Sequence, residues 1–373
     1  MNYYIIAGEA SGDLHASNLM RELNKLDSMA VFRCWGGDRM MQEGGVLVKH
    51  YRDLAFMGFT EVVMNIRTII SNISFCKKDL LENRPDVLIL VDYPGFNLRL
   101  AEFAKQHGIK VFYYISPQIW AWKQSRVEKI RRSVDRMFVI LPFEKEFYKK
   151  FDIDVEFVGH PLLDALEQQK GDSEDKDAWS KQNGLSDNPI IALLPGSRKQ
   201  EISEMLPLMV SVTDDFPEYQ FVIGAAPSIP LEFYQSRLKG NKTPLLLDQT
   251  YLLLIHSNAA LVTSGTATLE TALFDVPEVV CYKGGRISYL IAKSLIKVKF
   301  ISLVNLIMDR EVVKELIQQE LSSLNLKNEL KKILDPVNQQ RIKKDFQELK
   351  KRLGGPGASA RTARIMYDDL LNS

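Results

Sequence analysis

A run of five apolar residues, Ile190–Leu194, followed at once by Pro-Gly-Ser-Arg, constrains the fold of this chain more than any other stretch. An entirely apolar strand is typical of a parallel sheet covered on both faces, and the Pro-Gly pair ends it in a turn before a helical pattern begins. Such a turn presents backbone N–H groups beside a helix start, Gly196 permits close approach, and Arg198 adds a fixed positive charge. The stretch therefore indicates either a phosphate-binding turn, with Ser197 as the N-cap of the helix that follows, or an ordinary strand-to-helix connection with an exposed arginine.

The same succession of strand, turn and helix recurs along the chain. We predict further apolar strands, each followed by a turn and a helical segment, at Tyr3–Ala7, Asp86–Val91, Lys110–Ile115 and Ala259–Thr263. Regular alternation of strands and helices is typical of α/β domains built on a parallel sheet. We therefore expect the α/β class throughout, with Rossmann-like units.

Two interruptions divide this pattern. A chain of 373 residues is long enough for two domains of ordinary size. A polar, acidic segment lies near the middle, and a Gly-Gly-Pro-Gly break precedes the last helical stretch, and both are typical of domain boundaries. We expect a first domain at 1–170, a linker at 171–188, a second domain at 189–352 and, at 353–373, a terminal helix free to cross back to the first domain.

Composition argues against several classes of protein. Lys+Arg is 48 and Asp+Glu is 47, a formal net charge of +1, so binding of nucleic acid over a large surface is not expected. The three cysteines form no CxxC pair and the five histidines no HExxH spacing, so neither a disulfide framework nor a metal site is expected. No apolar run approaches the roughly 20 residues that span a bilayer, and no basic leader precedes the first strand. We expect a cytosolic protein.

Candidate site residues in the first half follow the predicted strands. Asp92 comes directly after Asp86–Val91, and ligands of open α/β sheets bind beyond the carboxyl ends of strands. It is either a catalytic carboxylate or an ordinary turn aspartate, with a loop over 92–97 before a helix over 98–106. Trp120 and Trp122 follow the next strand, either as a ligand wall or as packing.

A second anion-binding turn is predicted in the other half of the chain. Ser264, Gly265 and Thr266 stand between the strand at Ala259–Thr263 and a helix start. Glu270 lies one turn into that helix, where its carboxylate could accept hydrogen bonds from both hydroxyls of a ribose. The alternative for Glu270 is a carboxylate that stabilises the positive end of the helix.

An apolar helical stripe and a basic helix also remain open to two interpretations. The segment 61–82 has a broad apolar face, which is either core or a surface for lipid, and this face contains Val62, Val63, Ile66, Ile69, Ile70 and Ile73. The basic segment from Lys123 to Arg132 is either a solvated face or a contact for anionic headgroups.

Seven stretches, taken together and in order, resemble the lipid-A-disaccharide synthase family. They are Ala7–Asp13, Met57–Val62, Asp92–Asn97, Ser116–Trp122, Leu194–Arg198, Ser264–Glu270 and Val304–Leu306. The resemblance covers essentially the whole chain, and the ordered set is far more specific than any one motif. The chain departs from the family where it has Gly95 in place of an aspartate, Val304 in place of a proline and Glu278 in place of a methionine. These departures concern local loop geometry.

The resemblance implies a GT-B fold, two Rossmann-like domains facing across a cleft, and an inverting glycosyl transfer. UDP-2,3-diacylglucosamine would donate its sugar to the 6-hydroxyl of 2,3-diacylglucosamine 1-phosphate, with no metal or other cofactor, giving a β-1,6-linked disaccharide and UDP in lipid A biosynthesis. It implies a peripheral enzyme at the cytosolic leaflet of the inner membrane, with a homodimer left open.

The family motifs also suggest roles for residues. The catalytic group would be Asp92, Glu9 and Asn305. The donor group, for UDP, would be Gly196, Ser197, Arg198, Ser264, Gly265, Thr266 and Glu270. The acceptor and lipid group would be Ser11, Met57, Asn97, Trp120, Trp122 and Ile69.

Two alternatives come from other classes. One is another GT-B enzyme, such as a UDP-sugar epimerase or a peptidoglycan glycosyltransferase; an epimerase needs no apolar acceptor surface. The other is a nucleotide-sugar binding protein, which would bind UDP without turnover.

Overall fold

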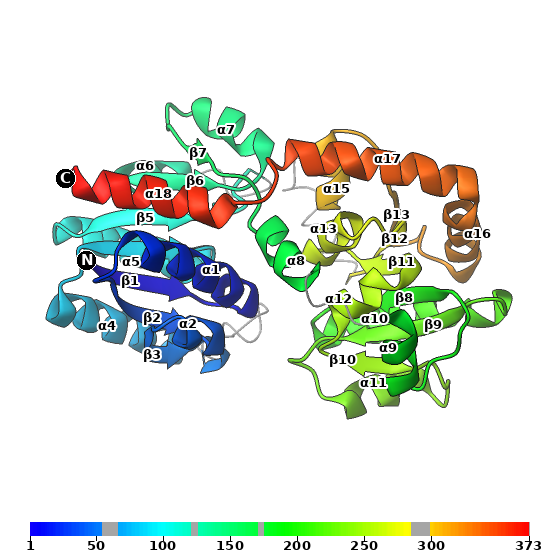
Figure 1. Ribbon diagram of the computed structural model, residues 1–373. Coiled ribbons are helices and arrows are strands. Elements are labelled where there is room, and N and C mark those ends of the chain that lie inside the picture. The colour runs from blue at the N-terminus through cyan, green and yellow to red at the C-terminus, as the bar shows by residue number, and fades with distance from the viewer. Residues whose placement is uncertain (54–65, 121–125, 171–174, 285–298, 373) are drawn as a thin grey trace. The chain divides into compact units, whose positions relative to one another are not determined.

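The computed structural model describes residues 1–53, 66–120, 126–170, 175–284 and 299–372. The chain forms two compact units, drawn in Figure 1 from blue at the N-terminus to red at the C-terminus. Unit 1 contains Met1–Glu167 together with Leu353–Ser373, and unit 2 contains Gln168–Arg352. Each unit is described by itself below.

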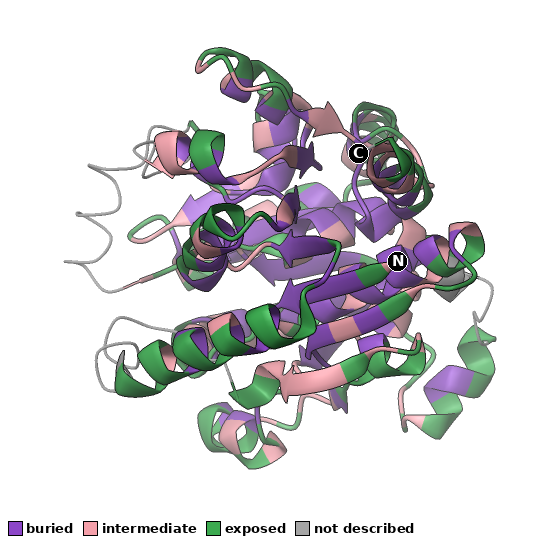
Figure 2. Cartoon of the chain, turned by 90° about the vertical axis from the view of Figure 1, so that its left-hand side faces the viewer, coloured by how far each residue is buried: buried purple, intermediate pink, exposed green. Residues whose placement is uncertain are grey.

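Unit 1 is built on a parallel sheet of order β3-β2-β1-β4-β5-β6-β7. Its central strand, β4, is apolar and buried over its whole length, as is typical of a strand covered by helices on both faces. The strands are β1 (Asn2–Ala7), β2 (Val31–Gly36), β3 (Val46–His50), β4 (Val87–Val91), β5 (Lys110–Tyr114), β6 (Arg136–Val139) and β7 (Glu156–Phe157). Figure 2 shows these strands largely buried, while the helices around them carry exposed residues on their outer sides.

The helices of unit 1 connect these strands in the alternation expected from the sequence. They are α1 (Ala10–Leu26), α2 (Asp38–Gln42), α4 (Ile66–Asn83), α5 (Pro94–Gln106), α6 (Val127–Ser133), α7 (Pro142–Lys149), α8 (Leu162–Lys170), in which the unit ends, and α18 (Ala358–Leu371). Helix α5 begins at Pro94 rather than at 98, because proline is well suited to the first helical position. The expected loop over 92–97 is therefore mostly helix.

The terminal helix α18 packs against α1 in unit 1. The carboxylate of Asp164, in α8, accepts hydrogen bonds from the backbone N–H groups of Gly357 (2.6 Å) and Ser359 (2.8 Å). It thereby satisfies donors that the start of a helix leaves unpaired. This contact, between residues almost two hundred positions apart, attaches the end of the chain to the unit in which it begins.

Unit 2 has a second parallel sheet, of order β10-β9-β8-β11-β12-β13. Its strands are β8 (Ile190–Leu194), β9 (Gln220–Ala225), β10 (Leu245–Leu247), β11 (Ser257–Thr263), β12 (Glu278–Tyr282) and β13 (Lys314–Ile317). Its helices are α9 (Lys176–Gln182), α10 (Lys199–Val210), α11 (Leu231–Leu238), α12 (Thr250–Ile255), α13 (Thr266–Leu273), α15 (Leu303–Met308), α16 (Ser323–Leu334) and α17 (Pro336–Arg352).

The segment 171–188, expected to be a linker, is in part a packed element of unit 2. It contains helix α9, in which Trp179 is buried and belongs to the apolar core of that unit. The indole N–H of Trp179 donates to the side-chain oxygen of Gln249 (2.8 Å). Composition alone suggested a linker here because the surrounding residues are polar, whereas one buried tryptophan is enough to anchor a short helix.

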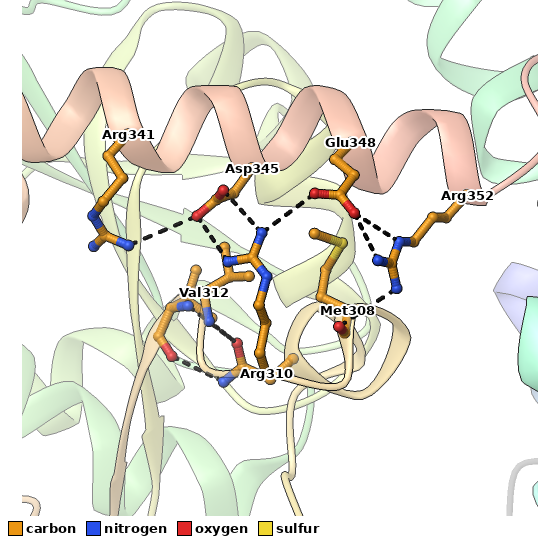
Figure 3. Close-up of polar contacts among 9 residues, drawn as sticks. Met308, Arg310, Val312, Arg341, Asp345, Glu348 and Arg352 are labelled. Atoms are coloured by element: carbon orange, nitrogen blue, oxygen red, sulfur yellow. Dashed lines mark hydrogen bonds and ion pairs between the residues drawn. The ribbon is translucent and has the colours of Figure 1, made fainter.

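An ion-pair network fixes the C-terminal part of α17, the last helix of unit 2 (Figure 3). The Arg310 guanidinium donates to both carboxylate oxygens of Asp345 (3.1 and 2.9 Å), and a second carboxylate, that of Glu348, lies 3.4 Å away. Arg352 pairs with Glu348 and donates to the carbonyl oxygens of Ile307 and Met308, at the end of α15. Two-oxygen contacts of this kind hold planar groups in one orientation, so α17 is held against the loop that follows α15.

One buried carboxyl group opposes the stability of unit 2. Glu278, at the start of β12, is fully buried, and neither of its carboxyl oxygens has a hydrogen-bond partner among the described residues. Glu315 lies on the same face of the sheet, because it pairs with Val280 in the register of β12 and β13. Burial, and secondly the Glu315 charge, raise the pKa of Glu278 well above its usual range. Methionine, which the resemblance described above suggests at this position, has a similar size and no charge.

Replacement of Glu278 by methionine should raise the melting temperature, by about 2–5 °C at pH 8 for a unit of this size. The folded-state pKa of the Glu278 carboxyl exceeds its unfolded value, so its unfavourable contribution grows as the pH rises above the unfolded pKa of about 4.3. Scanning calorimetry of wild type and Glu278→Met at pH 5 and pH 8 measures the gain in melting temperature at each pH. A gain that is equal at both pH values would contradict the titration argument.

Candidate active site

In unit 1, the strand order reverses between β1 and β4, which are neighbours in the sheet. The segment after β1 carries Glu9, the residue before α1, and the segment after β4 carries Asp92. Carboxyl ends of adjacent parallel strands meet at one edge, and such a reversal is where ligands of α/β sheets bind. The two carboxylates predicted to be catalytic are thus brought to the same corner of unit 1.

The environment of Asp92 suits a general base. Its side chain is partly exposed, and burial, followed by the negative charge of Glu9, raises the pKa of its carboxyl group to about 7. The backbone N–H of Tyr93 acts in the opposite direction. A carboxylate that is both ionised and strongly basic near neutral pH is well matched to accepting a proton from a hydroxyl group.

Residues of the first family motif build this corner. A Cβ atom on Gly8 would lie 2.4 Å from the Tyr93 ring, so only glycine permits the ring to pack there. The Asp13 carboxylate accepts from the backbone N–H groups of Gly37 (2.7 Å) and Met40 (3.2 Å), which places it at the start of α2 in a structural role. Ser11 is exposed in the first turn of α1, as an acceptor contact requires.

Three residues expected on the acceptor side have structural contacts instead. Asn97 is fully buried, and its amide nitrogen donates to the carbonyl oxygens of Asp92 (2.7 Å) and Val91 (3.2 Å). Trp120 is buried and packs edge-on against Phe143, with ring centroids 4.9 Å apart. Ile69 packs against the apolar core. Met57 and Trp122 lie outside the described residues.

In unit 2, the turns predicted to bind phosphate follow β8 and β11, which are adjacent at the corresponding reversal of strand order. Gly196 has φ +107°, a conformation that side chains other than glycine rarely adopt. The Glu201 carboxylate accepts from the backbone N–H of Ser197 (3.2 Å) and from the Arg198 guanidinium (3.2 Å). The turn thus already holds an oxyanion of its own chain, and Ser197 and Arg198 are exposed.

The turn after β11 follows the strand adjacent to β8. The backbone N–H of Ser264 donates to the carbonyl oxygen of Cys281 and its hydroxyl to that of Ile301 (3.2 Å), while Gly265 and Thr266 are exposed at the start of α13. Glu270 follows one turn later. Burial raises the pKa of its carboxyl group, and the Tyr251 hydroxyl, which donates to it (3.1 Å), acts in the opposite direction.

Asn305, expected to be catalytic, is a structural residue of unit 2. It is fully buried, and its amide nitrogen donates to the carbonyl oxygen of Val313 and to the Glu315 carboxylate (2.9 Å each). Its amide oxygen accepts from the backbone N–H groups of Val312 (2.7 Å) and Val313 (3.1 Å). These bonds leave no donor of the amide nitrogen unused, so Asn305 fixes the loop between α15 and β13 and is not retained as catalytic. Val304 beside it is also fully buried.

Three residues at these sites were not predicted. Tyr113, on β5, donates from its hydroxyl to the carbonyl oxygen of Asp92 (2.5 Å). Glu201 occupies the turn after β8, and Glu315 accepts from the backbone N–H of Ser302 (2.9 Å) and from Asn305. A tyrosine within an apolar strand and glutamates at ordinary helix and strand positions carry no local signal, because their roles depend on partners distant in sequence.

Within the part of the chain that the structure describes, no helix has the length and apolar character required to cross a membrane.

Known proteins resemble this chain over nearly its whole length. A sequence model described as lipid-A-disaccharide synthetase matches residues 3–367. The lipid-A-disaccharide synthase of Trichlorobacter lovleyi is 39% identical over 370 residues, covering 97% of this chain and 96% of that protein. The corresponding protein of Syntrophus aciditrophicus is 40% identical over 368 residues, covering 96% and 95%.

Solved structures resemble the fold at much lower identity. The UDP-GlcNAc 2-epimerase from Neisseria meningitidis bound to UDP-GlcNAc has a TM-score of 0.68 at 14% identity and covers 100% of both chains. The glycotransferase of kitacinnamycin has a TM-score of 0.66 at 12% identity and covers 99% of both chains. These likenesses show the GT-B fold alone. The sequence matches, which span nearly the whole chain, show that the protein belongs to the lipid-A-disaccharide synthetase family.

Proposed function

We propose that this protein is an inverting glycosyltransferase that joins two acylated glucosamines. UDP-2,3-diacylglucosamine donates its sugar to the 6-hydroxyl of 2,3-diacylglucosamine 1-phosphate. The products are the β-1,6-linked lipid A disaccharide 1-phosphate and UDP. The family of the chain supports this reaction, and the observation that carries it is the Asp92 carboxyl group, at a ligand-binding sheet edge with a pKa of about 7.

In the proposed mechanism, unit 1 activates the acceptor. The Asp92 carboxylate takes the proton of the 6-hydroxyl, and the oxygen forms a bond to the anomeric carbon of the donor sugar. The bond from that carbon to the diphosphate breaks, and its electron pair leaves with UDP. A single displacement inverts the anomeric centre, so no covalent intermediate with the protein is required.

Unit 2 holds the donor in this proposal. Arg198 and the backbone N–H groups of the turns after β8 and β11 bind the diphosphate and stabilise the charge that develops on it as it leaves. Its oxygens would displace the Glu201 carboxylate, which makes contacts of the same chemistry. Glu270 would accept from the ribose hydroxyls, with Tyr251 orienting it.

The decisive experiment mixes the purified protein with the two diacyl sugars and follows the disaccharide by mass spectrometry. The epimerase alternative is tested in the same samples, by looking for a 2-epimer of the UDP-sugar when the acceptor is omitted. A nucleotide-sugar binding protein would bind UDP in calorimetry but release none. Disaccharide formation that requires both substrates supports the proposal, and its absence from folded protein would contradict it.

We also propose contact with the cytosolic leaflet of the inner membrane, because both substrates carry acyl chains. The predicted contact surface is the apolar face of the segment 61–82, and only part of that face is exposed. Ile73 is buried and Ile69 packs against the core, whereas Ile70 is 55% exposed. Val62, Val63 and the side chain of Ile66 lie outside what is described. Of the three stripe residues whose side chains are described, Ile69 and Ile73 therefore belong to the core side of α4 and Ile70 does not.

Three cations in the described part of the basic segment, 126–132, already have carboxylate partners. Arg131 and Arg132 both pair with Glu128, and Lys129 pairs with Glu102. A homodimer remains a prediction, which sedimentation velocity would test.

Replacement of Ile70 by serine should weaken binding to vesicles that contain anionic lipid by about threefold to tenfold, since an exposed isoleucine contributes about 1 kcal/mol when it enters an apolar phase. The melting temperature should stay unchanged. The control is Ile73→Ser, which should lower the melting temperature because Ile73 is core. Unchanged vesicle binding by Ile70→Ser would move the proposed contact away from α4.

A further inference from the structure

The backbone at the proposed catalytic aspartate has an unusual conformation. Asp92 and Tyr93 both have left-handed backbone angles, with φ +45° and +47°, although neither is glycine. Residues other than glycine adopt this conformation at a cost in free energy, and it persists only where the surroundings hold it. Two such residues in succession, between the end of β4 and the start of α5, call for a physical cause nearby.

That cause is visible in the contacts of the Asp92 carbonyl oxygen. The pairing between β4 and β5 ends at Val91 and Tyr114, beyond which the Asp92 N–H donates to the Tyr114 carbonyl oxygen. The Asp92 carbonyl oxygen instead accepts from two side chains, the Tyr113 hydroxyl (2.5 Å) and the Asn97 amide (2.7 Å).

Both donors are fully buried, and they come from different elements, β5 and the first turn of α5. Donors on two elements fix the direction of one carbonyl group, and with it the backbone angles of Asp92. Those angles determine where the Asp92 carboxylate lies relative to Glu9. The charged and titratable groups that act on this corner are Glu9 on the carboxylate and on Tyr93, and Tyr148 and Arg126 on Tyr113.

We propose that Tyr113, together with Asn97, is a positioning residue that holds the Asp92 carboxylate in its reactive orientation through the backbone carbonyl group. This inference rests on the proposed function, in which Asp92 is the general base. Tyr113 itself is fully buried, so its assigned role is to orient Asp92 and not to bind substrate. Its hydroxyl group is far from the donor turns in sequence and belongs to the other unit, so its loss should leave UDP binding unchanged.

The test is Tyr113→Phe, which removes only the hydroxyl group. The Asp92 carboxylate should then turn more freely toward water, so kcat should fall by about tenfold to a hundredfold, as expected when a reacting group is displaced by about 1 Å. The ascending limb of the pH profile of kcat should also move below the wild-type value, because better hydration favours the charged carboxylate. The KM for the UDP-sugar should not change.

The matched control is Tyr114→Phe. Tyr114 is the next residue of β5, equally buried, and its hydroxyl lies on the opposite face of the sheet, near Ser359 and Thr362 of α18. This variant should keep the wild-type kcat and pH profile. If the Tyr113 hydroxyl group had only a structural role, Tyr113→Phe would lower the melting temperature and leave the pH profile of kcat at the wild-type position.

Asp92→Asn, measured in parallel, distinguishes failure of the proposed general base from failure of the proposed positioning role. If Asp92→Asn keeps wild-type turnover, the proposed function of Asp92 fails. If Asp92→Asn is inactive but Tyr113→Phe keeps the wild-type kcat and pH profile, the positioning role of Tyr113 is overturned. Should Tyr113→Phe fail to fold, Asn97→Ser removes the other donor to the Asp92 carbonyl oxygen and should change kcat and its pH profile in the same direction. An unchanged pH profile of Asn97→Ser would overturn the proposal.

Discussion

Replacement of Asp92 by asparagine should lower the rate of disaccharide formation by about 10²–10⁴-fold, the usual contribution of a general base. Asparagine keeps the size of the side chain but has no basic carboxylate. The variant should fold, with a melting temperature at pH 8 at or above that of wild type. Burial and the Glu9 charge oppose ionisation of the Asp92 carboxyl group, and the Tyr113 and Asn97 contacts that hold this corner are to the Asp92 carbonyl oxygen. Continuous release of UDP, coupled to product analysis, measures the rate.

The control is Asp86→Asn, at the opposite end of the same strand. Asp86 is exposed and accepts from the backbone N–H of Asn2 (2.7 Å), outside the proposed site. It should keep wild-type turnover. The wild-type rate should rise as the pH passes through about 7, since the Asp92 carboxyl group must lose its proton to act. Turnover of Asp92→Asn within threefold of wild type would exclude the proposed base.

Replacement of Arg198 by alanine should weaken UDP binding by about tenfold to a hundredfold, because a charge-assisted hydrogen bond contributes roughly 1.5–3 kcal/mol. The Arg198 side chain is exposed, and its contact with Glu201 shows that its guanidinium reaches an oxyanion in the turn after β8. Titration calorimetry with UDP measures the change directly and does not depend on turnover.

Two further variants test whether a loss of affinity is specific to the guanidinium group of Arg198. Arg198→Lys keeps the charge but loses the planar fork, so its affinity should lie between those of wild type and Arg198→Ala. Arg237→Ala removes an arginine of α11 that belongs to neither turn and stacks on Phe233, a ring that Lys199 also approaches. It should weaken UDP binding much less than Arg198→Ala does. If Arg198→Ala bound UDP as tightly as wild type, the proposed donor site would have to be moved.

Much of the fold could be predicted because its signals are local. The apolar runs that became β1, β4, β8 and β11 are strands buried on both faces, and burial on both faces leaves an uninterrupted apolar sequence. The edge strands β3 and β13 are not predicted by the same pattern. They are short, are only partly buried and carry polar residues, so their pairing depends on the neighbouring strand rather than on their own sequence.

Some residues of the candidate site could likewise be assigned from sequence, whereas the roles of others depend on the tertiary structure. Asp92 could be placed at a ligand-binding edge from sequence, because its position depends only on where an apolar run ends. Asn97 and Asn305 stand in equally specific motifs, yet the structure shows that both are buried and hold backbone groups in place. A sequence motif can contain both residues that contact substrate and buried residues that hold the site in place. The motif alone does not distinguish the two kinds.

The sequence by itself thus determined the α/β class, the family and the sheet edges at which the site residues lie, because each depends on residues close together in the chain. The tertiary structure alone decided which face of α4 is core, that Tyr113 reaches Asp92 from another strand, and that Glu9 raises the pKa of the Asp92 carboxyl group. These depend on distances between atoms far apart in sequence, and burial and charge act through those distances.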